Sequence, residues 1–335
     1  MDIAVVVAGG VTQTLHATPL LRTLRAAEGT ARIVLLCPAA SAPLWGGLPG
    51  VDQTLPLVAL DGRVSVATAA TVWAQLRKRR LDAVLLCSAA AELRLAAYLA
   101  GIPRRLGPGG GPSAVLLTDR GAVQAGESPA ATWVRLAGLL GIQSQLHATQ
   151  FEPGSEARNR ATRMLIEGCG SEGGRHWVAI APGSGTGGRH GNGHGGAAWE
   201  PERYALLANA IATHSGAQVI VVGTEDERPT VEASLLDTGV EVVDFSGERD
   251  LRVTAAIIAR CDVLVAADGP LLHLAAAVGT RSVGLFGPTH GVTRGPYGGD
   301  NRIVQAVGPA GDDDDTPMME RIRVEDVLAA LDTLL

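Results

Sequence analysis

Short aliphatic runs alternate with longer segments of helical period along most of this chain. In the first half, strand-like runs such as residues 3–8, 83–87 and 114–117 alternate with helical segments such as residues 64–79. The same alternation restarts beyond a polar, glycine-bearing stretch at residues 151–174. Alternation of this kind is typical of parallel sheets covered on both faces by helices. The sequence therefore predicts an α/β protein with two doubly wound domains, and 335 residues suffice to give each domain its own core.

The predicted domains divide the chain into four parts. We expect an N-terminal domain at residues 1–155, an interdomain linker at residues 156–175 and a C-terminal domain at residues 176–310. Residues 311–335 would form a solvated acidic loop and a C-terminal helix, because a run of aspartates begins at Asp312. Doubly wound sheets bind ligands outside the carboxyl ends of their strands, and ligand sites favour domain interfaces. A cleft between the two domains is therefore the expected ligand site.

Charge and cysteine usage exclude several classes of partner. The 28 basic and 34 acidic residues give a formal net charge of -6 without a long basic run, which argues against nucleic acid. The isolated cysteines, together with His190 and His194 in a glycine-rich loop, lack the spacing of a metal site. No run reaches about 18 apolar residues, and the N-terminus lacks the features of a signal peptide. We expect a protein of the cytoplasm, either soluble or peripheral at the inner face of the cytoplasmic membrane.

The most conspicuous loop is rich in glycine and follows a predicted strand at residues 177–181. Gly185 lets backbone N–H groups approach an anion closely, and Ser184, Thr186 and Arg189 add donors, so this loop is a candidate phosphate site. The loop contains the pattern G-x-G-x-x-G, but a dinucleotide fingerprint requires a helix to open directly from the glycines. Here the loop runs on well beyond the last of them. An NAD(P)-dependent oxidoreductase is therefore disfavoured, and a merely flexible loop is the main alternative to a phosphate site.

A second candidate site begins where the predicted strand at residues 263–267 ends. Asp268 and Gly269 come next, and His273 falls in the first turn of the helix that follows. Asp268 would lie at the carboxyl end of its strand, where a doubly wound sheet binds its ligand. The alternative is structural, because an aspartate at this position can also cap the helix.

Two further loops follow predicted strands of the second half. Gly287 and Thr289 come after one of them, with Arg294 close by, and Gly223 and Glu227 come after another. Small residues and polar donors at several strand ends indicate a nucleotide-sized anionic ligand. Glu227 would bind ribose hydroxyls; its alternative role is to supply an acidic group at a helix N-terminus.

Taken together, these segments resemble glycosyltransferase family 9, the ADP-heptose:lipopolysaccharide heptosyltransferases. Residues 268–277, Asp-Gly-Pro-Leu-Leu-His-Leu-Ala-Ala-Ala, are similar to the family's Asp-Ser-Gly-Pro-Met-His-Leu-Ala-Ala-Ala segment. Residues 284–289 (Gly-Leu-Phe-Gly-Pro-Thr) and 295–298 (Gly-Pro-Tyr-Gly) also resemble family segments. In the first half, Ala-Thr-Pro-Leu-Leu at residues 17–21 is similar to the family's Thr-Thr-Pro-Leu-Leu. The resemblance covers almost the whole chain and is stronger in the second domain.

The resemblance implies a GT-B fold, in which two Rossmann-like domains face a cleft. It also implies transfer of a sugar, heptose from ADP-heptose, to an acceptor hydroxyl with inversion at the anomeric carbon. Asp268 would then hold hydroxyls of the donor sugar, with His273 supporting it. The strand-end donors would stabilise the departing diphosphate, so no metal cofactor is expected. The resemblance does not fix the identity of the acceptor, which is lipopolysaccharide core, a protein side chain or a small metabolite.

The chain departs from the family at two positions. The family usually has an aspartate base six residues before the helix proline, and this position is Gln13. An amide orients a hydroxyl but does not accept its proton at neutral pH. The family also has a lysine two residues before a tryptophan, where this chain has Ala197. His16, one helical turn beyond Gln13, is the candidate replacement base because imidazoles titrate near neutral pH, and Arg189 is the candidate replacement cation.

These departures leave three interpretations. The replacement residues take over, the acceptor nucleophile needs no strong base, or the chain is a catalytically degenerate nucleotide-sugar-binding protein or partner subunit. Of these, an active glycosyltransferase is the hypothesis that we carry forward.

Overall fold

The computed structural model describes residues 1–27, 29, 31–57, 64–143, 147–170, 175–183, 199–307 and 318–335. The chain divides into two compact units, unit 1 (Met1–Glu152) and unit 2 (Pro153–Leu335). Each unit contains one six-stranded parallel sheet, and both sheets follow the same strand order, 3-2-1-4-5-6 in each unit's own count. This order belongs to doubly wound folds, so the predicted α/β class is confirmed in both halves.

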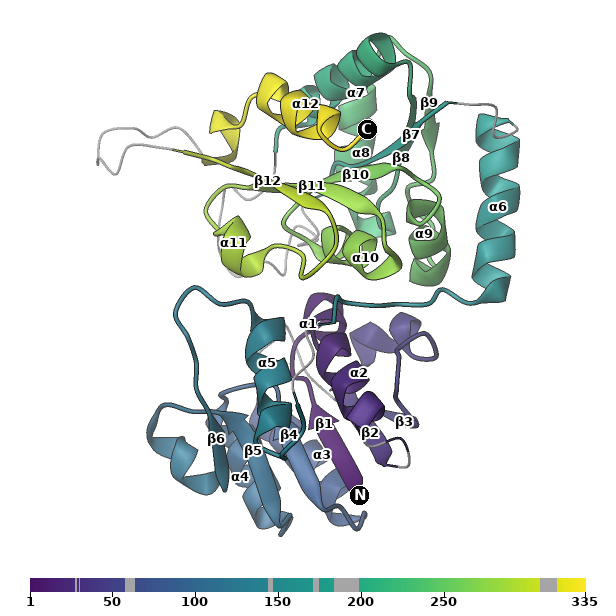
Figure 1. Ribbon diagram of the computed structural model, residues 1–335. Helices are drawn as coiled ribbons and strands as arrows, with labels where there is room; N and C mark the ends of the chain where they lie inside the picture. Colours follow the sequence, from purple (N-terminus) through teal and green to yellow (C-terminus); the bar gives the residue numbers. More distant parts are fainter. Residues whose placement is uncertain are drawn as a thin grey trace. The chain divides into compact units, whose positions relative to one another are not determined.

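The sheet of unit 1 has the order β3-β2-β1-β4-β5-β6 (Figure 1). In its centre, Ile3 of β1 lies opposite Ile33 on one side and Ala83 on the other. These strands are aliphatic on both faces because helices cover both faces. The strands are β1 (Asp2–Val6), β2 (Arg32–Pro38), β3 (Gln53–Leu57), β4 (Ala83–Leu86), β5 (Arg104–Pro108) and β6 (Asp119–Gly121).

Two pairs of helices enclose this sheet. Helices α3 and α4 pack on one face, and α2 and α5 pack together on the other (Figure 1). Ser65 starts α3 because its hydroxyl accepts a hydrogen bond from the backbone N–H of Thr68. The helical segments are α1 (Val11–His16), α2 (Thr18–Ala27), η1 (Ala39–Leu44), α3 (Val66–Arg77), α4 (Ala91–Leu99), η2 (Pro112–Leu116) and α5 (Pro129–Gly138).

The sheet of unit 2 has the order β12-β11-β10-β7-β8-β9. Its strands are β7 (Trp177–Ala181), β8 (Gln218–Val221), β9 (Val242–Asp244), β10 (Val263–Ala267), β11 (Arg281–Phe286) and β12 (Asn301–Gln305). Its helical segments are α6 (Ser155–Cys169), α7 (Pro201–Ser215), η3 (Glu225–Glu227), α8 (Arg228–Leu235), α9 (Leu251–Ile258), α10 (Pro270–Val278), α11 (Gly291–Arg294), η4 (Met318–Arg321) and α12 (Val324–Asp332).

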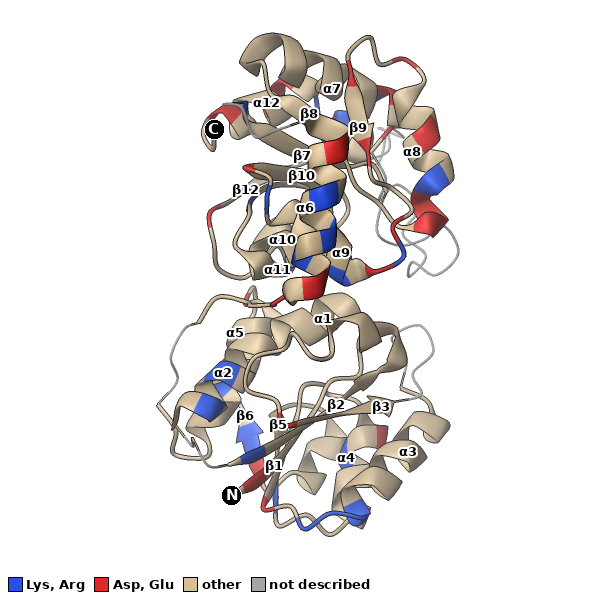
Figure 2. Cartoon of the chain, turned by 90° about the vertical axis from the view of Figure 1, so that its right-hand side faces the viewer, with Lys and Arg blue, Asp and Glu red and all other residues tan. Residues whose placement is uncertain are grey.

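Helix α6 occupies most of the segment for which the sequence predicts an interdomain linker. It packs against α9, and Arg160 of α6 forms an ion pair with Glu248 at 2.7 Å. Charged residues of both signs lie along its length (Figure 2). The segment forms a helix despite its polar composition, because a buried residue recurs every four positions, at Ala157, Ala161 and Leu165.

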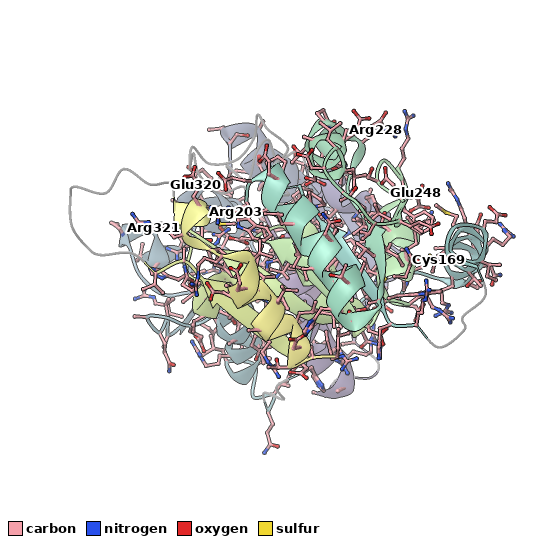
Figure 3. All side chains as sticks on the ribbon, turned by 90° about the horizontal axis from the view of Figure 1, so that it is seen from above. Cys169, Arg203, Arg228, Glu248, Glu320 and Arg321 are labelled. Carbon is pink, nitrogen blue, oxygen red and sulfur yellow. The ribbon has the colours of Figure 1, made fainter. Side chains whose placement is uncertain are left out.

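The C-terminal residues belong to unit 2. Helix α12 packs against α7 and β12, and Arg203 of α7 donates a hydrogen bond to the carbonyl oxygen of Ile322. Figure 3 labels Arg203 beside Glu320 and Arg321 of η4. Trp199 also donates to the Ile322 carbonyl, at 3.0 Å, and stacks edge-on against Tyr204 with ring centroids 4.8 Å apart. The final helix therefore completes the core of unit 2.

One predicted strand is wrong. Residues 114–117, an apolar run, lie in and just after the 3-10 helix η2, and the neighbouring strands are instead β5 and β6. Short apolar runs do not distinguish a strand from a buried turn of helix. Among the described residues, no helix is both long enough and apolar enough to cross a membrane.

Candidate functional site

The loop after β10 leads directly into helix α10 at the carboxyl edge of the second sheet. Gly269 is the residue before the helix, and Pro270 occupies its first turn, where the missing N–H costs nothing. No side chain among the described residues caps this helix, and its first turn holds no acidic residue. The first N–H groups of α10, together with the helix dipole, therefore favour an external anion.

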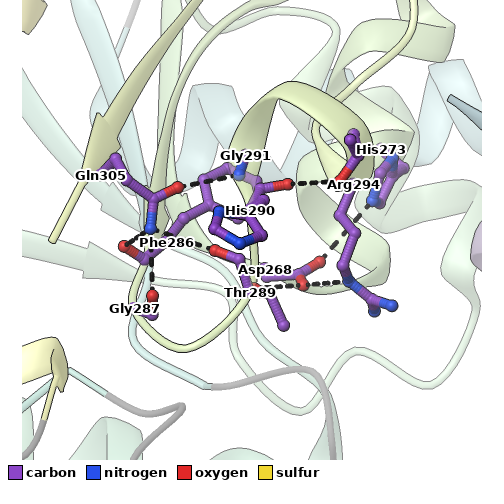
Figure 4. A network of polar contacts seen from close by, with 10 residues as sticks. Asp268, His273, Phe286, Gly287, Thr289, His290, Gly291, Arg294 and Gln305 are labelled. Atoms are coloured by element: carbon purple, nitrogen blue, oxygen red, sulfur yellow. Dashed lines mark hydrogen bonds and ion pairs between the residues drawn. The ribbon is translucent and has the colours of Figure 1, made fainter. Parts of the chain in front are cut away.

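The Asp268 carboxylate is the centre of a polar network beside this helix start (Figure 4). Thr289 donates its hydroxyl hydrogen to Asp268 Oδ2 at 3.0 Å, and Arg294 donates from Nε to the same oxygen at 2.9 Å. His273 Nε2 lies 3.9 Å from the other carboxylate oxygen, Oδ1. The structure thus brings together Asp268 and Thr289, which follow predicted strands, and His273, which lies in the first turns of α10. Asp268 bonds side chains rather than the N–H groups of α10, so it does not act as the helix cap.

The network keeps Asp268 ionised. Burial by itself raises the pKa of this carboxyl group, but the contact with His273, the positive charge of Arg294 and the hydrogen bonds from Arg294 and Thr289 outweigh it. The pKa falls from 3.8 to about 2. An ionised carboxylate accepts hydrogen bonds only. Asp268 is therefore suited to hold sugar hydroxyls and is not suited to donate a proton at neutral pH.

Arg294 is the member of this network to which sequence analysis gave no role. Its side chain is 58% exposed, whereas that of Asp268 is 15% exposed. Within the described part of the chain, the bond from Nε to Asp268 is the only hydrogen bond of its guanidinium. The two terminal amino groups are left to bind an anion beside the start of α10.

Gln305 of β12 fixes the loop that carries Thr289. Its side-chain amide donates to the carbonyl oxygens of Phe286, Gly287 and Thr289 at 3.0, 3.0 and 3.1 Å. Its oxygen accepts from the N–H of Gly291 at 2.9 Å (Figure 4). Sequence reasoning missed this residue, because one glutamine in a strand gives no sign that its amide will bind a loop.

Two strand ends of the second sheet also bring Gly183, Gly223 and Glu227 together. Glu227 is 5% exposed and accepts a hydrogen bond from the N–H of Thr224 at 2.8 Å, in a capping box at the start of η3. A Cβ on Gly183 would lie 2.1 Å from the carboxyl carbon of Glu227, so a larger residue there would displace this buried side chain. A Cβ on Gly223 would lie 3.6 Å from Glu227 Oε2. The structural alternative for Glu227, at a helix start, is therefore observed; binding of ribose stays a prediction.

The two candidate residues of unit 1 lie in α1, just beyond the carboxyl end of β1. Gln13 is half-buried, and its side chain folds over Gly9, where a Cβ would lie 2.5 Å from Gln13 Cγ. His16 is 3% exposed and stacks edge-on against Trp133 of α5, with centroids 6.5 Å apart. The two residues lie in one short helix, as the spacing predicts, but the imidazole faces the packed interior. Its role as a base stays a prediction.

Ser184, Gly185, Thr186 and Arg189, and with them Ala197, lie outside the described residues. Their proposed contacts with phosphate stay predictions. Gly287 is described, and a Cβ there would lie 2.7 Å from Met319 Sδ, so a larger residue would displace the Met319 side chain of η4.

Known proteins resemble this chain over most of its length. Lipopolysaccharide heptosyltransferase 2 of Salmonella typhimurium is 23% identical over 316 residues, which cover 92% of this chain and 88% of that protein. The crystal structure of a family 9 glycosyltransferase from Veillonella parvula matches with a TM-score of 0.82 at 17% identity, covering 99% of this chain and 96% of that one. E. coli heptosyltransferase WaaC with ADP-2-deoxy-2-fluoro heptose matches with a TM-score of 0.73 at 16% identity, covering 99% of both chains.

The structural matches confirm the predicted fold class, two Rossmann-like doubly wound domains of the GT-B type. The profile described as glycosyltransferase family 9 (heptosyltransferase) matches residues 70–316, which is well over half of the chain. A shared fold alone would leave the chemistry open, but this match lies in the sequence and spans the Asp268 network. The chain therefore belongs to glycosyltransferase family 9 and is a glycosyltransferase.

Proposed function

We propose that this enzyme transfers heptose from ADP-heptose to a hydroxyl group of a lipopolysaccharide core acceptor, with inversion and without a divalent metal. The observation that carries the proposal is the ionised Asp268, held by Thr289 and Arg294 beside the start of α10, which no described side chain caps. One site then offers acceptors for sugar hydroxyls and donors for a diphosphate. The names of the similar proteins support heptose, ADP and lipopolysaccharide as the matching substrates.

In this proposal, the diphosphate lies at the N-terminus of α10 and the sugar lies at Asp268. The N–H groups of the first turn and the guanidinium of Arg294 stabilise the negative charge that grows on the departing ADP. Ser184, Thr186 and Arg189 would add donors to the same phosphates. The anomeric carbon is attacked on the face opposite the leaving group, so its configuration inverts. The anomeric C–O bond to the diphosphate breaks as the new glycosidic C–O bond forms, and the proton of the acceptor hydroxyl leaves to a base.

The acceptor would lie at the carboxyl edge of unit 1. Gln13 orients its hydroxyl through the side-chain amide, and His16 takes the proton after its side chain leaves the contact with Trp133. A protein side chain or a small metabolite is the second class of acceptor. The catalytically degenerate binder is the less favoured alternative, because the donor-side network is intact. Action on a lipid-linked acceptor would place the enzyme at the inner face of the cytoplasmic membrane.

The test compares Asp268→Asn with Asp237→Asn, a matched change at an exposed carboxylate of the same unit. ADP release and the mass of the glycosylated product are followed with ADP-heptose and inner-core acceptors. We expect Asp268→Asn to lose about 10²–10³-fold in rate while Asp237→Asn stays near wild type, because the lost contact acts where the transition state develops. Equal rates in the two variants would contradict the role of Asp268. Binding of ADP without release from ADP-heptose under every acceptor would support the degenerate binder.

A further inference from the structure

The outward side of α3, α4 and η2 in unit 1 is unusually apolar. Leu95, Tyr98 and Leu99 are spaced so that they share one side of α4, and they are 46%, 51% and 59% exposed. Val66 at the start of α3 and Val115 in η2 are 80% and 71% exposed. Helix α4 packs against both α3 and η2, so these residues belong to one surface, which we call the α3–α4 face. Several large exposed apolar residues gathered on adjoining elements are typical of an interaction site.

Among the described residues, few charged groups lie on this face. Residues 64–76 include no charged residue, and Figure 2 shows α3 without one until its C-terminal end. On α4, Arg94 is buried, which leaves Glu92 as the exposed charge of that helix. A helix that faces water normally carries charged or polar residues on its outer side, so solvent alone does not account for this composition.

Basic residues border the face at one end. Arg77, Lys78, Arg79 and Arg80 follow one another where α3 ends, and three of them are exposed. Both α3 and α4 run antiparallel to the strands, so both end at the amino edge of the sheet, where β4 and β5 begin. The face thus combines an apolar surface with a local excess of positive charge in a chain whose net charge is -6.

Two aromatic side chains join the apolar and the basic parts. The Arg77 guanidinium lies 5.3 Å from the centre of the Trp73 ring, and that of Arg105 lies 5.5 Å from the centre of the Tyr98 ring. Such pairs place an apolar ring and a cation at the same depth. Tryptophan and tyrosine are enriched at the boundary between lipid tails and headgroups, and arginine side chains extend to the headgroups from apolar surfaces.

We propose that the α3–α4 face docks unit 1 on a membrane surface that contains anionic lipid. The aliphatic residues enter the boundary of the acyl chains, while Arg77, Lys78 and Arg80 contact the headgroups. A second copy of the chain would cover the apolar residues as well, but it would bring the same basic cluster rather than the carboxylates needed to neutralise it. An anionic lipid surface fits both parts of the face, because its acyl chains accommodate the apolar residues and its headgroups neutralise the basic residues.

Docking on this face also suits the acceptor side of the proposed reaction, on which the inference rests. Val66 and Val115 lie in segments that leave the carboxyl ends of β3 and β5, and Gln13 lies in the segment that leaves β1. One end of the face therefore borders the edge where the acceptor is proposed to bind. A sugar acceptor anchored in the same lipid surface would reach that edge from the side.

The apolar half is tested by co-sedimentation of the full chain with vesicles of phosphatidylethanolamine and phosphatidylglycerol (3:1), with pure phosphatidylcholine as comparison. The variant is Leu95→Gln/Tyr98→Gln/Leu99→Gln. Its matched control is Ile166→Gln/Leu206→Gln/Leu236→Gln, which changes three exposed apolar residues of unit 2 that are 53%, 58% and 82% exposed. We expect at least a tenfold loss of vesicle partitioning in the first variant and less than a twofold change in the control. Equal losses, or no loss, would overturn the proposal.

The basic half is tested with Arg77→Gln/Lys78→Gln/Arg80→Gln on the same vesicles. Each basic residue near an anionic surface contributes about 1 kcal/mol, so partitioning should fall about fivefold per residue removed and lose much of its salt dependence. Equal binding of the wild-type chain to phosphatidylcholine would overturn the role of charge. A wild-type dimer in size-exclusion chromatography that the Leu95/Tyr98/Leu99 variant dissociates, without vesicle binding, would assign the face to self-association instead.

The outcome is separable from that of the proposed transfer reaction. Heptose transfer to a delipidated, water-soluble core acceptor should keep its wild-type rate in both face variants, because neither variant touches Asp268 or α1. A chain that partitions onto the vesicles as expected but releases no ADP would leave the docking face standing and refute the transferase. A chain that transfers heptose but binds no vesicle would do the reverse.

Discussion

The two units share one strand order, but the helix that follows the fourth strand begins differently in each. In unit 1, the helix after the fourth strand is α4, which is preceded by Ala90 and carries Glu92 in its first turn. In unit 2, the equivalent helix is α10, which is preceded by Asp268 and Gly269 and has no acid in its first turn. The start of α4 supplies its own negative charge, while that of α10 leaves this place for a ligand. The fold thus creates the position twice, and the sequence makes only one of the two fit for an anion.

The largest expected effect concerns unit 1, where His16 is the proposed base. If His16 is the base, His16→Ala should lower kcat for heptose transfer about 10²–10⁴-fold, because general base catalysis is worth that much. The pH dependence that a titrating base gives to kcat should disappear with it. His214→Ala, at a histidine whose side chain is 72% exposed, is the control. A loss below about threefold, with the pH profile unchanged, would show that His16 only packs against Trp133.

The next effect concerns Arg294, the cation of the Asp268 network in unit 2. Arg294→Gln should weaken binding of ADP about 10- to 100-fold, since a hydrogen bond to a charged group contributes about 1.5–3 kcal/mol. Isothermal titration calorimetry measures this directly. Arg323→Gln removes another exposed arginine, paired with Asp326 in the same unit, and should leave ADP affinity unchanged. An ADP affinity that survives Arg294→Gln would place the diphosphate away from α11.

The depressed pKa of Asp268 predicts a pH-dependent contribution to stability. The charged form is favoured in the folded state, so its contribution is complete above the ordinary pKa of 3.8 and is lost as pH falls toward about 2. At pH 7, the difference in unfolding free energy between wild type and Asp268→Asn should be about 2 kcal/mol. It should shrink steadily between pH 4 and pH 2 in urea titrations. A difference independent of pH in that range would mean that packing, and not charge, is what the substitution changes.

Much of this arrangement is predictable from the sequence, because the strand-end rule depends only on local pattern. Asp268, Thr289 and Gly223 each follow an aliphatic run, so their shared edge follows from a parallel sheet. The pattern fails where strands lack aliphatic residues, as in β6, which is Asp-Arg-Gly. It also fails for contacts set by side-chain direction across long separations, such as Arg294 with Asp268 or Gln305 with the Thr289 carbonyl. Such contacts determine at which strand end a charged network forms.

The smallest expected effect concerns the start of α4 in unit 1, the counterpart of the start of α10. Glu92→Gln removes the first-turn acid of α4 and should lower the stability of unit 1 by about 0.5 kcal/mol, as expected for a charge near a helix N-terminus. Glu202→Gln does the same to α7 in unit 2 and serves as the matched change. The measurement is urea unfolding at low ionic strength, where screening is weakest. Added ADP should stabilise unit 2 in the same titration and leave unit 1 unaffected, because α10 is the helix start that awaits an external anion. Stabilisation of unit 1 by ADP would mean that the start of α4 also binds the ligand and that Glu92 does not occupy it.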